Sequence, residues 1–461
     1  MWRDLFRRGR APVTLTACLG EGVYALNAFL TSTSMPVAVL EVGGVRFIAW
    51  STTVYLVAAI VAGSATGFLK GRFGARRLLL AAAMLFLVGT LAAGAAQDMG
   101  TILVGRAFQG AGEGAIAAAC YALVAERLPS ALAPKAFGLM ALVWAVAAFG
   151  GPLLGGLLTE TLSWRAAFLV NLPLIAAFVL LVRRAVPPQV VAPDGAAVPF
   201  GRITGIAVGI MLIAVAAVAG SLPLSAASAF GGVGVIALMF LLDRRAAVRL
   251  FPADAFRPRT TVGAGLWVVL LMPLGQASTS VYLPITLQSL WGWSPTLAGA
   301  LVGAMALSWS GAALLVAIPA GPGWAVPCIR IGALTLVAGL VAAALAVPTR
   351  DGGLMLACQV VIGTGFGVGW AFLNQAVAAA APRQDRDLAA ALVPTAQSAG
   401  YAIGAALAGL IANMSGYAAG LAAHTDNGRA GWIFGTGAAV AAIAALFSLG
   451  VRRAAPIEAP E

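Results

Sequence analysis

Long apolar runs separated by short polar segments recur along the whole of this 461-residue chain. Each run has roughly the 20 residues that an α-helix needs to cross the hydrocarbon core of a membrane. Only residues 222–225 separate the seventh run from the eighth, so that boundary is the least distinct. The pattern predicts about fourteen membrane-spanning helices, at residues 13–36, 47–69, 78–97, 101–124, 136–158, 164–182, 203–221, 226–242, 262–286, 297–319, 327–347, 353–379, 388–412 and 430–451.

Two longer polar connections, Arg183–Arg202 and Asp243–Thr261, flank the seventh and eighth runs. We therefore expect residues 1–185 to form an N-terminal six-helix bundle and residues 261–461 a C-terminal six-helix bundle. Residues 186–260 would add two inserted transmembrane helices with flanking cytoplasmic loops. No segment is long enough for a separate soluble domain, which argues against a fused ATPase or kinase module. The predicted fold class is an all-α polytopic membrane protein.

The composition supports a membrane protein, since only 10% of the residues are charged and 61% are hydrophobic. A soluble domain carries roughly 25% charged residues. The net charge of +12 could indicate a nucleic-acid partner, but the basic residues gather in alternate short loops, which is how membrane proteins fix their orientation. We therefore expect no nucleic-acid partner and both termini in the cytoplasm. Of the 28 Lys and Arg residues, only five fall outside the predicted cytoplasmic segments: Arg46, Arg106, Arg165, Arg350 and Arg429.

Two ionisable residues, Arg106 and Glu113, interrupt the fourth apolar run. Their spacing of seven residues is about two helical turns, so both side chains project from one face together with Gly110. Ionisable groups at membrane depth are costly unless they face a partner or a watered cavity, so they mark transport pathways by default. The alternative is a structural Arg–Glu pair that only holds helices together. Glu21, the only carboxylate in the first run, is either a second such group or a solvated residue near the membrane surface.

The loop GFLKGRFGARRL, after the second run, resembles the motif that joins helices two and three in the major facilitator superfamily. Gly71 stands where that motif has an aspartate, so a charge that could engage a helix N-terminus is missing. The positions that match are Gly67, Leu69, Arg72, Gly74, Arg76 and Arg77.

Further motifs point to the exporters of this superfamily. In the fourth run, Leu103, Arg106, Gln109 and Gly110 resemble the motif whose arginine the family links to proton coupling. In the fifth run, the glycine- and proline-containing pattern resembles the motif that marks exporters, and Ser163–Pro173 and Val281–Gly299 resemble the fourteen-helix multidrug:proton antiporter branch. The residues of the fifth-run pattern are Gly138, Gly151, Pro152, Gly155 and Gly156.

This resemblance implies the major facilitator fold, with two six-helix bundles and two extra central helices. It also implies a proton-coupled secondary transporter that exports amphipathic or hydrophobic compounds by alternating access across a bacterial cytoplasmic (inner) membrane. Its partners would be the small-molecule substrate, protons and membrane lipids. We expect a monomer without cofactor, metal site or enzymatic activity.

The resemblance and the polar residues at membrane depth together define the candidate site. Asn27 takes the place of the aspartate that the branch carries in helix one, so proton coupling is assigned instead to Glu113, Glu21 and Arg106. The conformational motifs contribute Gly67, Arg72, Gly74, Arg76, Gly151, Pro152, Gly155 and Gly156. The candidate substrate-cavity residues are Asn27, Thr31, Gln109, Gln276, Tyr282, Gln359, Trp370 and Asn374.

Other functions remain open. A lipid or metabolite exporter would use the same apolar cavity, and a non-transporting membrane sensor would fit the departures at Gly71 and Asn27. An uptake permease is disfavoured by the exporter pattern in the fifth run. A membrane-embedded enzyme would need paired acids or histidines at one face, and the only close acidic pair, Asp385 and Asp387, is balanced by neighbouring arginines.

Overall fold

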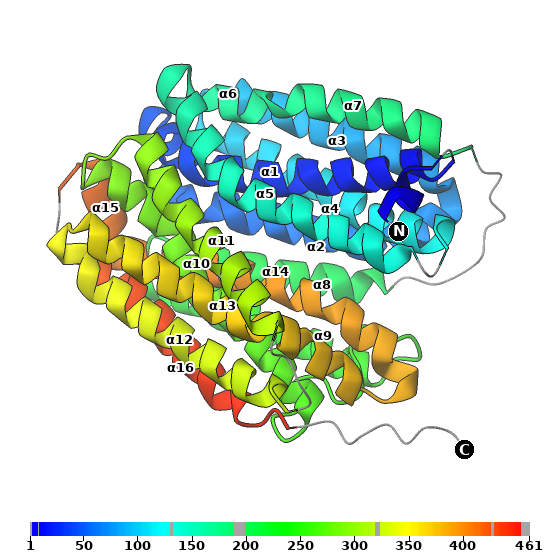
Figure 1. The fold of residues 1–461 in the computed structure, drawn as a ribbon. Coiled ribbons are helices and arrows are strands. Elements are labelled where there is room, and N and C mark those ends of the chain that lie inside the picture. Colours follow the sequence, from blue (N-terminus) through cyan, green and yellow to red (C-terminus); the bar gives the residue numbers. More distant parts are fainter. Residues whose placement is uncertain are drawn as a thin grey trace.

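The computed structural model describes residues 2–7, 9–129, 132–188, 199–318, 323–425 and 428–452, and all regular elements in this part of the chain are helices. Figure 1 shows two helical bundles that meet at one end and diverge toward the other. The described chain begins and ends at the diverging end, which we call the terminal end. We call the opposite end, where the bundles meet, the far end.

The helices follow the predicted order. The first bundle contains α1 (Ala11–Glu41), α2 (Ile48–Phe73), α3 (Ala75–Gly94), α4 (Met99–Arg127), α5 (Ala133–Thr161), α6 (Trp164–Leu169) and α7 (Asn171–Ala185). Two helices follow, α8 (Phe200–Ala216) and α9 (Leu222–Arg244). The second bundle contains α10 (Thr261–Ser289), α11 (Pro295–Ala317), α12 (Ala325–Ala346), α13 (Gly352–Ala380), α14 (Arg386–Met414), α15 (Tyr417–Ala422) and α16 (Ala430–Ser448). Short 3₁₀ turns complete the set: η1 (Trp2–Phe6), η2 (Val45–Phe47), η3 (Val347–Thr349) and η4 (Arg383–Asp385).

Twelve of the described spans are long and apolar enough to cross a membrane. The predicted count of about fourteen also includes α4 and α8, which fall outside these twelve. The α4 helix has 29 residues but carries Arg106, Gln109 and Glu113, and α8 has only 17 residues. The fold class is therefore confirmed as an all-α polytopic membrane protein, while the count of fourteen stays a prediction.

Glycine lets α4 lie in the middle of the first bundle, in direct backbone contact with α2 and α3. A β-carbon at Gly110 would overlap the carbonyl oxygen of Tyr55, and one at Gly114 would overlap that of Ala59. Small residues are the usual way for membrane helices to pack closely, because the lipid provides no hydrophobic driving force between helices. The charged residues of α4 are consequently enclosed by protein.

The second bundle repeats this arrangement. Glycines Gly363 and Gly367 of α13 meet the carbonyl oxygens of Met305 and Trp309 on α11, with the same spacing of four residues. The segments GAGEGA (residues 110–115) and GTGFGV (residues 363–368) are therefore equivalent positions of an internal repeat. In this repeat Phe366 takes the place of Glu113.

We expect Gly110→Ala to lower the free energy of unfolding by about 3 kcal/mol, because an added methyl group in a tight contact forces the backbone apart. The measurement is the SDS-induced unfolding of the purified protein in mixed micelles. Gly67→Ala, on the partner helix α2, is the matched control, since a β-carbon there meets nothing within 4 Å. Equal losses in both variants would contradict the close approach of α2 and α4.

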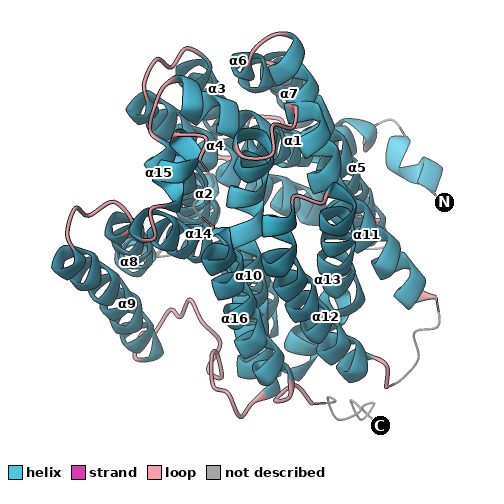
Figure 2. Ribbon diagram, turned by 90° about the vertical axis from the view of Figure 1, so that its left-hand side faces the viewer, coloured by secondary structure: helices cyan, strands magenta, loops and turns pink. Residues whose placement is uncertain are grey.

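The α8 helix packs between one helix of each bundle. Its residues Ile210 and Ala214 lie in apolar clusters with α2 and α14, and the indole nitrogen of Trp50 on α2 donates a hydrogen bond to the carbonyl of Ala214 (2.9 Å). Figure 2 shows α9 outside α8, at the edge of the molecule. The inserted pair thus covers the α2–α14 side of the molecule. The domain division at residues 186–260 remains our interpretation.

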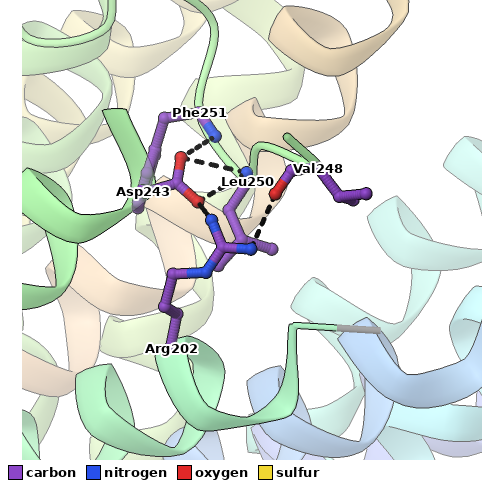
Figure 3. Close-up of polar contacts among 5 residues, drawn as sticks. All are labelled: Arg202, Asp243, Val248, Leu250 and Phe251. Carbon is purple, nitrogen blue, oxygen red and sulfur yellow. Dashed lines mark hydrogen bonds and ion pairs between the residues drawn. The ribbon is translucent and has the colours of Figure 1, made fainter. Parts of the chain in front are cut away.

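The segment that follows α9 is fixed by one buried carboxylate (Figure 3). Asp243, which is fully buried, pairs with Arg202 of α8 and accepts hydrogen bonds from the backbone N–H groups of Leu250 (2.9 Å) and Phe251 (3.0 Å). The Arg202 guanidinium also donates to the carbonyl of Val248 (2.6 Å). Further along, the N–H of Ala253 donates to Asp385 (2.9 Å), beside the start of α14. Residues 245–260 therefore tie α8 and α9 to the second bundle at the terminal end.

The described hydrogen bonds between the two bundles lie toward the far end. The Thr53 hydroxyl donates to the carbonyl of Ala402 (3.1 Å), and the Gln288 amide donates to the carbonyl of Thr33 (3.1 Å). Two more join Thr296 N–H to Glu160 (3.4 Å) and the Asn413 amide to the carbonyl of Arg46 (3.0 Å). The bundles also touch through α5 with α11 and α2 with α14.

Candidate functional site

The centre of the first bundle holds a hydrogen-bonded cluster built around Asn27 of α1. Its amide nitrogen donates to the Glu113 carboxylate (Oε2, 3.2 Å). Its amide oxygen accepts from Gln109 of α4 (3.4 Å) and from Asn171 of α7 (3.4 Å), and Gln109 also donates to Thr90 of α3 (3.0 Å). All five residues are fully buried. Four helices thus meet through polar side chains in an otherwise apolar bundle.

Arg106 extends this cluster toward α2. Its guanidinium donates to the Gln109 side chain (2.9 Å) and to the carbonyl of Ser51 (3.4 Å), and its carbon Cζ lies 3.9 Å from the ring centroid of Tyr55. A desolvated cation–π contact of this kind is worth about 2 kcal/mol. The charge of Arg106, which is only 3% exposed, is therefore held by an aromatic face and two oxygen acceptors.

Arg106 and Glu113 form no ion pair among the described residues, so the structure does not support the simple structural pair that was the alternative interpretation. They are joined instead through Gln109 and Asn27. A change in the charge of Glu113 would therefore reach Arg106 through two neutral amides.

Three buried oxygen atoms in this cluster lack a hydrogen-bond partner: Glu113 Oε1, the Tyr55 hydroxyl and Asn171 Oδ1. An unpaired buried charge is costly, whereas a carboxylate can remove that cost by binding a proton or a cation. Glu113 accordingly has one oxygen held by Asn27. Its other oxygen has no hydrogen bond of ordinary geometry, and the Tyr55 hydroxyl is the polar group that interacts with this carboxylate from α2.

Glu21 lies six residues, about 1.7 turns, before Asn27 on α1 and is 1% exposed. Its Oε2 accepts a hydrogen bond from the indole nitrogen of Trp144 on α5 (2.5 Å), and its Oε1 has no partner. The Trp144 ring packs edge-on against Tyr24 (5.3 Å between centroids), which lies 6.2 Å from the ring of Tyr55. Glu21 is therefore buried rather than solvated, and aromatic rings connect it to the Asn27 cluster.

The remaining candidate residue of the first bundle, Thr31, does not join the cluster. Its hydroxyl donates to the carbonyl of Asn27 (3.0 Å) within its own helix. The structure supplies three members that the sequence analysis missed, Tyr55, Thr90 and Asn171. Asn171 could have been suspected as a polar residue in an apolar run, but nothing in the sequence distinguishes Tyr55 from other tyrosines in the chain.

The candidates of the second bundle do not converge on one point. Gln359 and Asn374 lie on α13 about 22 Å apart along the helix axis. Gln276 donates to the sulfur of Met305 (3.2 Å), and Tyr282 is fully buried beside Tyr417 (6.4 Å between centroids).

Trp370 belongs instead to an aromatic cluster with Trp309 and Phe366, in which Trp309 stacks on Phe366 at 4.6 Å. Phe366 is the repeat equivalent of Glu113, so the first bundle has an acid where the second has an aromatic ring.

The conformational motifs lie at both ends. Gly74 joins α2 to α3 with a φ of 81°, and Gly67 and Gly71 face open space. Beside them Lys70 pairs with Glu126 of α4. This turn therefore contacts a carboxylate, although Gly71 stands where the family motif has its aspartate. Arg72 and Arg76 flank the turn.

The fifth-helix motif lies against α1 and α11. β-Carbons at Gly151 and Gly155 would overlap Phe29 and Leu30 of α1, and one at Gly156 would overlap the carbonyl oxygen of Pro295 on α11. The Pro152 carbonyl accepts a hydrogen bond from Thr33 (3.1 Å).

The family model for the Major Facilitator Superfamily matches residues 17–265, which is more than half of the chain. The chain belongs to the Major Facilitator Superfamily. It is therefore a membrane transporter rather than an enzyme. A probable multidrug-efflux transporter of Mycobacterium tuberculosis is 29% identical over 428 residues, covering 89% of each chain. Multidrug resistance protein 3 of Bacillus subtilis is 30% identical over 172 residues, covering 37% of this chain and 34% of the relative.

Solved structures of the Major Facilitator Superfamily confirm the fold. A D-xylose-proton symporter matches with a TM-score of 0.66 and 18% identity, covering 95% of this chain and 96% of the symporter. A peptide transporter in complex with sulfate matches with a TM-score of 0.68 and 17% identity, covering 96% of this chain and 95% of the transporter.

Proposed function

We propose that this transporter exports amphipathic or hydrophobic compounds in exchange for protons, with both termini on the cytoplasmic side. The observation that carries the proposal is Glu113, a fully buried carboxylate at the centre of a bundle, with one oxygen bonded to Asn27 and one without a partner. A carboxylate in this setting can exchange a proton for another ligand. The 29% identical relative named as a probable multidrug-efflux transporter supports this class of cargo.

In this proposal the first bundle binds protons and the second bundle contacts the cargo. The first holds the ionisable groups Glu113, Glu21 and Arg106, which would bind and sense protons. The second holds the aromatic cluster of Trp309, Phe366 and Trp370, whose faces can stack on an apolar cargo. Because Glu113 and Phe366 are both fully buried, an amphipathic compound would reach these residues only after the helices around them move apart.

Alternating access would proceed by opening the far-end contacts and closing the terminal end. The hydrogen bonds at the far end and the divergence of the bundles toward the terminal end support a cytoplasm-facing state (Figure 1). The basic loops at the terminal end support its cytoplasmic position.

The test is proton release from the purified protein when a panel of lipophilic cations is added. We expect release in wild type and none in Glu113→Gln, because glutamine keeps the shape of the side chain but cannot carry the proton. Glu126→Gln is the matched control, an exposed carboxylate on the same helix that pairs with Lys70, and it should release protons normally.

Unchanged release in Glu113→Gln would move the coupling site to Glu21 or elsewhere. Cargo binding without proton release in wild type would overturn the exchange mechanism and favour export of a lipid or a neutral metabolite. Loss of release in Glu126→Gln as well would indicate a general effect of removing charge.

A further inference from the structure

Trp144 has a position that the proposed function does not yet use. It lies on α5, the helix that packs against α1 on one side and against α11 of the other bundle on the second side. Its indole donates to Glu21, a carboxylate with no other described hydrogen-bond partner. Trp144 itself is only half-buried. The single strong contact of Glu21 is thus made by a helix that reaches the opposite bundle.

The surroundings of Glu21 leave no competing partner for its charge. Four titratable groups interact electrostatically with Glu21, and none of them is a cation: Cys18 and Tyr24 on α1, and Cys120 and Tyr121 on α4. From α7, Phe178 packs beside Gly20, one residue away. A hydrogen bond to an ionised group is roughly twice as strong as one to a neutral group. Ionised Glu21 therefore holds Trp144 firmly, and protonated Glu21 holds it weakly.

The next three turns of α5 reach the contact between the bundles. Phe29 of α1 packs on the Trp144 ring (6.1 Å between centroids) and also against Gly151. Five residues after Gly151, Gly156 lies against the backbone of Pro295 on α11. Any shift of α5 relative to α1 is therefore transmitted to the far-end contact.

We propose that Trp144 is a positioning residue that transmits the protonation state of Glu21 to α5, and so to the contact between the bundles. This inference rests on the proposed function in taking Glu21 as a second proton-binding group. When Glu21 is ionised, the indole N–H anchors α5 to α1. When Glu21 binds a proton, the anchor weakens and α5 is free to tilt with α11.

The chain supplies a matched control. Trp164 of α6 donates to Glu41 at the far end of α1 (2.8 Å), so the same pair of residue types recurs there. Glu41, however, also pairs with Arg165 (2.6 Å), and its side chain is 50% exposed. Removing the indole donor at Trp164 should therefore leave the proton response intact.

The experiment follows the fluorescence of Trp144 as the pH is changed, in purified protein without any cargo. The emission of Trp144 is obtained by subtracting the spectrum of Trp144→Phe from that of wild type. For each other variant, the same subtraction is made with the double variant that also carries Trp144→Phe. We expect it to titrate in wild type, in Glu113→Gln and in Trp164→Phe, but to be independent of pH in Glu21→Gln. A Trp144 emission that still titrates in Glu21→Gln would overturn the inference.

Transport gives the second readout. We expect Trp144→Phe to bind cargo as wild type does but to lose about tenfold in proton-driven transport, with a flattened pH profile, because a smaller aromatic ring remains and the charge-assisted hydrogen bond is lost. An unaltered pH profile in Trp144→Phe would also contradict the inference. Because the fluorescence titration needs neither cargo nor transport, it can succeed or fail separately from the proposed exchange mechanism.

Discussion

Moving the carboxylate from α4 to α1 should restore the proton exchange that the loss of Glu113 abolishes. We expect Glu113→Gln alone to show no cargo-driven proton exchange. The double variant Asn27→Asp, Glu113→Gln should recover it to within about tenfold of wild type, the remaining loss reflecting a carboxylate displaced from its original position. The measurement is proton-driven transport in proteoliposomes.

The reason is that Asn27 and Glu113 occupy one site from two helices. The Asn27 amide nitrogen lies 3.2 Å from Glu113 Oε2, so exchanging acid and amide between them keeps the hydrogen bond and reverses its donor. Gln109 and Asn171 would still donate to the side chain at position 27. The superfamily branch that this chain resembles has its aspartate at position 27, so in our proposal Glu113 would supply the acid from the neighbouring helix.

The control places an acid elsewhere at membrane depth. Asn374 lies on α13 of the second bundle, and its Oδ1 is also buried without a partner. The double variant Asn374→Asp, Glu113→Gln should remain inactive. Recovery in Asn374→Asp, Glu113→Gln would contradict this prediction, and so would a lack of recovery in Asn27→Asp, Glu113→Gln. Either result would show that proton exchange does not require an acid at the site shared by positions 27 and 113.

A methyl group at Gly156 should prevent the far end from closing fully. We expect Gly156→Ala to shift the equilibrium toward the state open at the far end by about thirtyfold, since a β-carbon there would overlap the carbonyl oxygen of Pro295 and overpacking costs about 2 kcal/mol. Spin labels at Leu162 and Leu297, introduced into a variant without native cysteines, would report the wider separation.

The control for this experiment lies on the same helix. A β-carbon at Gly150 meets nothing within 4 Å, so Gly150→Ala should leave the label separation unchanged. Equal widening in both variants would indicate that helix propensity, and not the contact with α11, sets the equilibrium.

The sequence predicted the helices well because apolar runs in a membrane protein have one dominant explanation. It missed the break between α6 and α7 at Val170, where Pro173 lacks the N–H that a continuous helix would need and crowds the carbonyl of Leu169. It also gave no indication of how α8 is placed, since an apolar helix can lie against any other.

Some members of the cluster were predictable from the sequence, but Tyr55, Thr90, Asn171 and the contacts between the members were not. Arg106, Gln109 and Glu113 were identifiable because polar residues at membrane depth are rare. Their connection through Asn27 was not identifiable, because Asn27 and Glu113 lie on different helices and are 86 residues apart in the chain. In the second bundle the same reasoning selected Gln359 and Asn374, although fifteen residues of one predicted helix already place them about 22 Å apart.

The position of α8 makes the two sides of the molecule unequal. Where α2 and α14 meet, α8 closes the seam from the membrane, and residues 245–260 hold it there (Figures 2 and 3). On the other side, where α5 meets α11, no further helix of the described chain covers the seam. Of these two seams, the α5–α11 contact is therefore the one that no inserted helix shields, so its close glycine packing at Gly156 and Gly299 borders the membrane directly.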